Sequence, residues 1–235
     1  SSFRSATSGE RMADAPASSA SCAEPSLQGE SEKDVDPSST APAAPVFTRD
    51  FEEREDGTII WHASLVLLHY MQAPERKMSG KRILELGSGL GHLGYGLARL
   101  GNHVTCTEQA KCLGELEASL QQLERDSGSA AAVGGSIRAV DMSWGEEGFV
   151  ASPLAKEDGG PGYDVIISAE LVYLEETHEL LLWAWQHFCG PQTEIFSVFV
   201  NRPFSWAFFV LVHDSDDFEV EQLEEGKDFD PCGME

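Results

Sequence analysis

The chain has 235 residues, of which 16 are Lys or Arg and 40 are Asp or Glu, giving a formal net charge of -24 at pH 7. This excess of acid argues against non-specific nucleic-acid binding, because such binding depends on Lys and Arg neutralising phosphates. It is compatible with a basic partner, such as a lysine-bearing protein, and equally with a role in solubility alone. The length accommodates one domain of ordinary size and a tail.

The cysteines and the hydropathy of the chain indicate its cellular compartment and the partners that we expect. The five cysteines are scattered without a C-x-x-C pair, so they indicate neither a disulfide framework nor a zinc site, and we expect no metal. A reducing compartment follows, and we predict a cytoplasmic protein, with the nucleus as the alternative. No apolar run reaches the roughly 18 residues of a membrane span. We therefore expect no membrane partner, and the charge argues against a nucleic-acid partner. We also expect a monomer.

The first part of the chain differs in composition from the rest. Residues 1–45 are rich in Ser, Ala, Pro, Glu and Asp and contain few large apolar groups, so we predict a disordered tail. Residues 46–235 are predicted to form one domain. Within it, residues 59–61 and 63–71 are expected to form a helix that leads into the domain, because their apolar positions fit a mostly buried helix.

Apolar segments then alternate along the chain. We predict strands at 82–86, 103–108, 136–141, 163–170, 193–200 and 217–223. Helices are expected between them, at 92–100, 111–126, 175–189 and 205–213, whereas 146–162 is expected to be a polar connection. Strands separated by helices predict an α/β fold with a mostly parallel sheet covered on both faces.

In such sheets, ligands bind beyond the carboxyl ends of the strands. The first strand ends in Glu85 and the turn Gly87-Ser88-Gly89, where glycines let a ligand approach the backbone. The second strand ends in Glu108, 19 positions beyond Gly89, where a carboxylate can accept hydrogen bonds from both hydroxyls of a ribose. Two acids and a glycine turn therefore indicate a nucleoside pocket.

The nucleoside is not fixed by the turn alone, because residues 89–94 also satisfy the G-x-G-x-x-G pattern of dinucleotide sites. A carboxylate at Glu85 would repel a pyrophosphate there, whereas it can attract the ammonium and sulfonium groups of S-adenosylmethionine. Trp61 and Trp144 offer flat faces for an adenine or a sulfonium cation. These residues favour S-adenosylmethionine as the cofactor.

Five runs of sequence together resemble a known family, the methyltransferase-like 21 group within lysine methyltransferase family 16. They cover parts of residues 46–225 and are specific in combination. The runs are Ile60-Trp-His-Ala-Ser-Leu-Val-Leu67, Lys81-Arg-Ile-Leu-Glu-Leu-Gly-Ser-Gly-Leu-Gly91, Val104-Thr-Cys-Thr-Glu108, Met142-Ser-Trp-Gly145 and Tyr163-Asp-Val-Ile-Ile-Ser-Ala-Glu-Leu-Val-Tyr-Leu-Glu-Glu-Thr177.

The resemblance implies a three-layer, Rossmann-like, seven-strand sheet and an S-adenosylmethionine-dependent protein-lysine N-methyltransferase. Its substrate would be a non-histone protein of the chaperone, AAA ATPase or translation factor class. It also implies a set of cofactor contacts, namely Trp61, Gly87, Ser88, Gly89, Glu108, Trp144 and Ala169. The catalytic positions would lie at the lysine entrance, where we expect Glu170 to orient the incoming ammonium and Tyr173 to hydrogen-bond the amine.

Two departures from the family stand out. The family usually has Asp-x-x-Tyr where this chain has Glu170-Leu-Val-Tyr173, which lengthens the acidic arm by one methylene. The fold also normally ends in an antiparallel strand inserted between the fifth and sixth, which we do not find before Glu235. We therefore expect a sheet short of one strand, or an incomplete sequence.

These departures keep other functions open. One alternative is a catalytically weak or inactive binding protein that retains the methyltransferase fold. Another is a methyltransferase for a different nitrogen nucleophile. Methylation of a nucleobase is disfavoured by the charge and by residues 169–173, which lack the Asn/Asp-Pro-Pro-Tyr/Phe run expected after the fourth strand.

Overall fold

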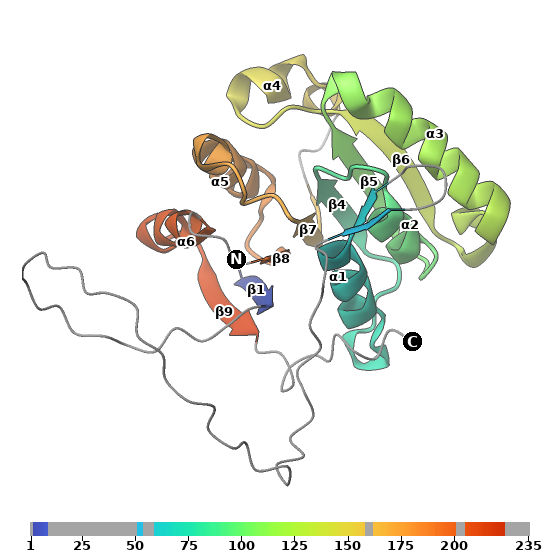
Figure 1. Cartoon of the computed structure of the whole chain (residues 1–235), viewed down its shortest axis with the longest axis horizontal. Coiled ribbons are helices and arrows are strands. Elements are labelled where there is room, and N and C mark those ends of the chain that lie inside the picture. The colour runs from blue at the N-terminus through green and yellow to red at the C-terminus, as the bar shows by residue number, and fades with distance from the viewer. Residues whose placement is uncertain (1, 9–50, 54–58, 158–161, 201–204, 224–235) are drawn as a thin grey trace, which may run out of the picture. The chain divides into compact units, whose positions relative to one another are not determined.

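The computed structural model describes residues 2–8, 51–53, 59–157, 162–200 and 205–223. Its central element is a seven-stranded sheet of order β6-β5-β4-β7-β8-β1-β9, in which all neighbours are parallel (Figure 1). The strands are β1 (Ser2–Ser8), β4 (Arg82–Leu86), β5 (His103–Glu108), β6 (Ser136–Asp141), β7 (Val165–Ala169), β8 (Glu194–Val200) and β9 (Glu219–Leu223). A separate antiparallel pair is formed by β2 (Phe51–Glu53) and β3 (Ile59–Trp61).

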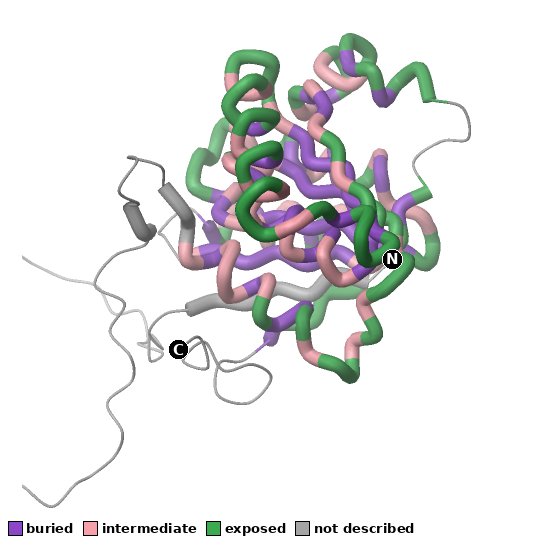
Figure 2. Tube along the Cα trace, turned by 90° about the vertical axis from the view of Figure 1, so that its right-hand side faces the viewer, coloured by how far each residue is buried: buried purple, intermediate pink, exposed green. Residues whose placement is uncertain are grey.

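Helices cover both faces of the sheet, as the alternating pattern predicted. One face packs against α1 (His62–Gln72), α2 (His92–Ala98) and α3 (Ala110–Ser127). The other packs against α5 (His178–Phe188), α6 (Ser205–Asp214) and residues around α4 (Glu146–Ala151). Figure 2 shows buried strands in the middle and exposed outer helix surfaces. No helix in the described ranges is long and apolar enough to cross a membrane.

Most predicted elements are confirmed, and the differences are shifted ends and a few elements that were not predicted. The strands at 82–86, 103–108 and 136–141 have the predicted bounds. The connection at 146–162 is wrong in part, because it contains α4 and the short helix η3 (Pro153–Lys156). The leading helix begins only at His62, since residues 59–61 pair with β2 as strand β3. Two consecutive isoleucines favour that extended backbone.

The sheet contains a strand that the sequence did not predict. Residues 2–8, expected to be part of a disordered tail, form β1 and pair with β8 on one side and β9 on the other. The expectation of a missing strand is also corrected, because β1 fills the position between β8 and β9, in parallel orientation. Backbone pairing on both sides satisfies its N–H and C=O groups whatever its composition. Residues 9–45 of the predicted tail lie outside the described residues.

A close approach between α2 and the sheet fixes the start of the first βα unit. Gly94 of α2 lies over Glu85 of β4 and Cys106 of β5, and a Cβ at Gly94 would come within 3.0 Å of both side chains. Glu85 is 4% exposed, and its Oε2 accepts a hydrogen bond from the Cys106 Sγ at 3.2 Å. The Gly94 N–H also donates to this carboxylate. A buried acid, Glu85, therefore lies next to the turn at 87–91.

Burial changes the protonation of that acid. Desolvation raises the pKa of Glu85 from 4.5 to about 7, outweighing the hydrogen bonds from Cys106, Ser88 and Gly94 that favour the charged form. Burial together with the neighbouring Glu85 charge also raises the pKa of the Cys106 thiol. Near neutral pH, Glu85 is therefore divided between its neutral and charged forms.

Replacing Gly94 with Ala should destabilise the fold by about 1–3 kcal/mol, because the added methyl group must displace Glu85 or Cys106. A matched control is Gly114→Ala in α3, where a Cβ meets no atom within 4 Å. That change should stabilise the helix by about 0.5–1 kcal/mol. Urea unfolding of both variants measures the difference, and equal effects of the two changes would contradict the close approach at Gly94.

Replacing Glu85 with Gln should change how stability depends on pH. Between about pH 4.5 and pH 7 the folded protein keeps a proton on Glu85 that the unfolded chain releases. The contribution of Glu85 to the free energy of unfolding therefore falls as pH rises through this window, by on the order of 3 kcal/mol, and stays low above it. Gln carries no such charge, so the stability of Glu85→Gln relative to the unmodified protein should rise from about pH 5 to about pH 8. A difference that stays constant with pH, in urea unfolding, would rule this out.

Candidate active site

A cavity of about 210 Å³ lies at the carboxyl ends of the central strands. The chain order reverses there, because β4 pairs with β5 on one side and with β7 on the other. Such reversals are where open parallel sheets bind ligands. The lining residues are Gly87, Glu108, Gln109, Met142, Ser143, Trp144, Leu171, Tyr173, Leu174, Thr177 and Leu180.

The glycine turn after β4 forms one wall of the cavity. Gly87 has a φ of 58°, and a Cβ there would lie 2.6 Å from Leu171 Cδ2 and 3.5 Å from Trp144 Cζ2. Only glycine therefore lets these side chains close over the turn. A Cβ at Gly89 would meet no atom within 4 Å. The turn thus presents backbone to open space, as a ligand lying against it requires.

Glu108, at the end of β5, lines the cavity beside the glycine turn. Its Oε1 accepts a hydrogen bond from the Gly89 N–H at 3.3 Å, and its Oε2 accepts one from the Gln109 N–H at 2.6 Å. The Ser88 N–H donates to the Thr107 carbonyl at 2.9 Å, which ties the turn to β5. These contacts hold a carboxylate at the cavity wall with lone pairs available to hydroxyl groups.

Two aromatic side chains line the same cavity. Trp144 is partly buried and follows β6, whereas Tyr173 is 53% exposed and follows β7. The structure thus brings together Gly87, Glu108, Trp144 and Tyr173, four of the predicted site residues. Gly89 adjoins them through its hydrogen bond to Glu108.

Other predicted site residues do not line the cavity. Glu85 points toward α2 and lies beneath the turn. The Ser88 Oγ is 3.5 Å from the Glu85 carbonyl, to which it donates, and Ala169 packs against the hydrophobic core. The backbone of Trp61 belongs to β3, but its side chain lies outside the described part of the structure.

Glu170 adopts a conformation that the sequence does not reveal. It has a left-handed φ of 58° and is 5% exposed. Its N–H donates to the Val198 carbonyl at 2.9 Å, and its Oε1 accepts a hydrogen bond from the Val200 N–H at 2.5 Å. The carboxylate therefore joins the ends of β7 and β8, and Glu170 is not among the residues that line the cavity.

Several lining residues were missed by the sequence reasoning. Gln109, Met142, Ser143 and Leu171 lie within two positions of predicted residues, so their position beyond a strand end was the available signal. The others come from the segment after Tyr173, which includes η4 (Glu175–Thr177). The run that resembles the family extends to Thr177, but no role was predicted for these residues. They are Leu174, Thr177 and Leu180.

The sequence of the chain matches a known protein family and several curated proteins. The sequence model of the lysine methyltransferase family matches residues 47–215. The chain is 32% identical to EEF1A lysine methyltransferase 3 of Xenopus tropicalis over 137 residues, which cover 58% of this chain and 54% of that protein. It is also 32% identical to protein N-lysine methyltransferase METTL21A of Danio rerio over 149 residues, 63% of each. The chain thus spans between half and two thirds of these relatives.

Among solved structures, a putative RNA methyltransferase from Pyrococcus horikoshii is 18% identical with a TM-score of 0.42, over 65% of this chain and 67% of that one. Magnesium protoporphyrin IX methyltransferase from Synechocystis with bound SAH is 19% identical with a TM-score of 0.37, over 53% and 49%. The family match covers most of the chain, including every residue of the cavity. The chain therefore belongs to the lysine methyltransferase family, whose methyl donor is S-adenosylmethionine.

Proposed function

We propose that this chain is a protein-lysine N-methyltransferase that acts on a non-histone protein. The observation that carries the proposal is that one cavity is lined by the glycine turn, Glu108, Trp144 and Tyr173. The first three suit a nucleoside, and Tyr173 offers an exposed aromatic edge to a second reactant. The names of the relatives support a lysine of a protein over a nucleobase as that reactant.

The cavity wall would hold the methyl donor through its nucleoside. The open space at Gly89 admits a ligand against the backbone, and Glu108 would accept hydrogen bonds from the ribose hydroxyls. Trp144 would cover the adenine or contact the sulfonium. S-adenosylmethionine supplies a methyl group on a sulfonium leaving group, so the protein mainly has to align the amine. We expect Glu85 to support the turn from below.

The lysine would enter past Tyr173. Leu171, Leu174 and Leu180 also line the cavity, and such apolar side chains disfavour the charged ammonium form. The Tyr173 hydroxyl can accept from or donate to the amine and exclude water. We propose no strong general base, because removal of water and alignment of a neutral amine account for the chemistry.

Glu170 is assigned a different role in this proposal. Its Oε1 is bound to the Val200 N–H, so we propose that Glu170 is a positioning residue rather than the group that holds the ammonium. By joining β7 to β8, it sets the backbone from which Leu171 and Tyr173 reach the cavity. The one-methylene difference from the family pattern would thus act through backbone position.

Methyl transfer tests the proposed function directly. The protein, incubated with tritiated S-adenosylmethionine and a cell lysate, should place acid-stable label on lysine of a protein band. Glu108→Ala should lose most of this label, because its carboxylate is needed for the ribose, and should bind S-adenosylhomocysteine at least about tenfold more weakly by calorimetry. Glu115→Ala, an exposed acid of α3, is the matched control. Donor binding without any labelled protein would instead identify an inactive binding protein.

Two substitutions of Glu170 separate positioning from charge. Glu170→Gln keeps an acceptor for the Val200 N–H and should retain labelling within about threefold, whereas Glu170→Ala should lose it by about tenfold or more. If Glu170 instead holds the ammonium by its charge, both variants should lose substrate affinity to a similar extent. Initial rates of label incorporation at several lysate concentrations distinguish these results.

A further inference from the structure

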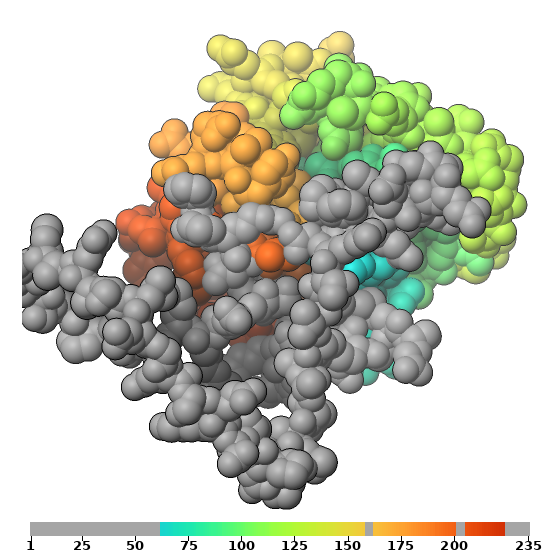
Figure 3. Space-filling model, viewed as in Figure 1, coloured from blue at the N-terminus to red at the C-terminus, as the bar shows by residue number. Residues whose placement is uncertain are grey.

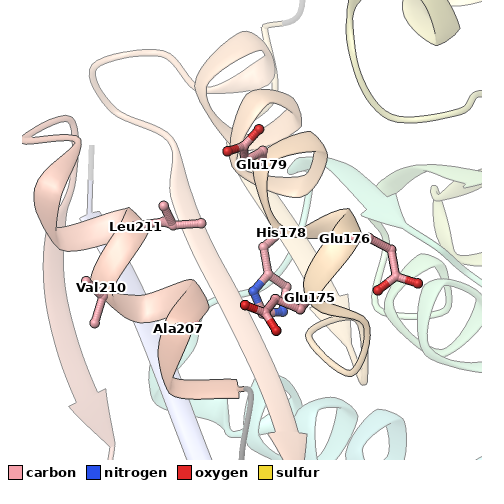
Figure 4. Close-up of a pocket in the computed structure, with 7 residues that line it drawn as sticks. All are labelled: Glu175, Glu176, His178, Glu179, Ala207, Val210 and Leu211. Atoms are coloured by element: carbon pink, nitrogen blue, oxygen red, sulfur yellow. The ribbon is translucent and has the colours of Figure 1, made fainter.

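A second cavity, of about 820 Å³, lies between α6 and the segment formed by η4 and the start of α5. We call it the α5–α6 groove, and Figure 3 shows these two helices side by side on the surface. The groove has an acidic side and an apolar side. In Figure 4, Glu175 lies beside His178 and Leu211 extends toward them from α6, whereas the Glu176 carboxylate points away from α6. The acidic side has Glu175, Glu176 and Glu179, the apolar side has Ala207, Val210 and Leu211, and His178 lies between them.

The acidic side carries uncompensated negative charge. Glu175, Glu176 and Glu179 are all exposed, and within the described residues none of them forms an ion pair. The facing wall contains Val210, which is 57% exposed, and no acid or base. A groove with one anionic and one apolar side matches a segment that is basic on one side and apolar on the other.

His178 supplies an independent indication of a ligand. Its ring is 1% exposed, packs edge-on against Phe208 at 5.5 Å between centroids, and lines the groove. Its Nε2 lies 3.3 Å from the Val172 carbonyl, which can only accept, so in the neutral ring Nε2 carries the proton. Nδ1 is then an acceptor, and it has no hydrogen-bond partner in the described part of the chain. A buried acceptor of this kind needs a donor, and the N–H groups of a Lys or Arg side chain can supply one.

The groove adjoins the active-site cavity. Residues of one short segment face both sites: Tyr173, Leu174 and Thr177 line the active-site cavity, whereas Glu176 and His178 line the groove. A chain that places a lysine beside Tyr173 therefore has the groove within a few residues of it.

We propose that the α5–α6 groove binds a basic, amphipathic segment of the substrate protein that lies close in sequence to the target lysine. Its assignment as a substrate site rests on the proposed function. Lys or Arg side chains would meet the acids and the His178 Nδ1, and apolar side chains would pack on Val210 and Leu211. Phosphate-bearing partners are repelled by the acids, and a second copy of a chain of charge -24 is repelled as well.

The probe is a fluorescent peptide of about 18 residues, built from Leu and Lys in amphipathic helical order, with a Leu/Glu peptide of the same pattern for comparison. Anisotropy in the presence of S-adenosylhomocysteine should show binding of the Lys peptide only, weakening as salt rises. Glu175→Gln/Glu176→Gln/Glu179→Gln should weaken it by about tenfold and leave calorimetric affinity for S-adenosylhomocysteine unchanged.

Two further variants make the result specific to the groove. Glu115→Gln/Glu117→Gln/Asp126→Asn removes the same charge from exposed positions of α3 and should weaken peptide binding less than twofold. Val210→Lys places a cation on the exposed apolar wall and should weaken it by about tenfold. Equal weakening by the two triple variants, or no binding of the Lys peptide by the unmodified protein, would overturn the proposal.

The assignment of the groove as a binding site and the proposed function can be tested separately, because peptide binding needs no methyl transfer. If a protein in the lysate is labelled but the groove variants bind the Lys peptide like the unmodified protein, only the groove assignment is wrong. If the groove variants lose peptide binding but no protein is labelled, the proposed function is wrong, and the substrate assignment fails with it. If both hold, the groove triple variant should also label its substrate with a raised KM and a similar kcat.

Discussion

Parallel pairing is the constraint on which this structure depends. Because β4, β5, β6 and β7 all run the same way, their carboxyl ends meet at one edge, and the chain segments that follow them meet there too. Gly87, Glu108, Trp144 and Tyr173 come from four such segments and line one cavity. No single segment could form this site, and its chemistry follows from the edge where the segments converge.

The turn after β4 depends on what lies beneath it. Gly94 lets α2 approach the sheet closely enough to enclose Glu85 and Cys106, and Glu85 in turn accepts hydrogen bonds from Cys106 and Gly94. A buried acid with a pKa near 7 costs stability when it is charged. In this molecule, that acid contacts Ser88 of the turn and Gly94 of α2, and it does not line the cavity.

The sequence predicted the strands well because apolar runs bounded by glycines and polar residues are strong local signals. Residues 82–86, 103–108 and 136–141 are of this kind. β1 carried no such signal, since its Ser-rich, mostly polar composition resembles that of unfolded segments, and its pairing with β8 and β9 is a long-range event. Composition reflects only the local conformational preference of a segment, and in β1 the pairing with distant strands outweighs that preference.

The candidate site was predicted in part, for reasons of geometry. Strand ends identified Gly87, Glu108, Trp144 and Tyr173 correctly as neighbours. They could not show which way Glu85 points, because β4 is buried on both faces and the pattern gives no inside or outside. The left-handed backbone at Glu170, which turns its carboxylate to Val200, is likewise invisible in the sequence.

We propose that one cavity at the strand ends holds both reactants of a methyl transfer. A crystal structure of the protein with S-adenosylhomocysteine and a lysine-containing substrate peptide tests it most directly. We expect the ribose on Glu108, the adenine against Trp144, and the lysine amine beside Tyr173, pointing at the sulfur. A nucleoside bound away from Glu108, or a lysine that does not reach the sulfur past Tyr173, would contradict it.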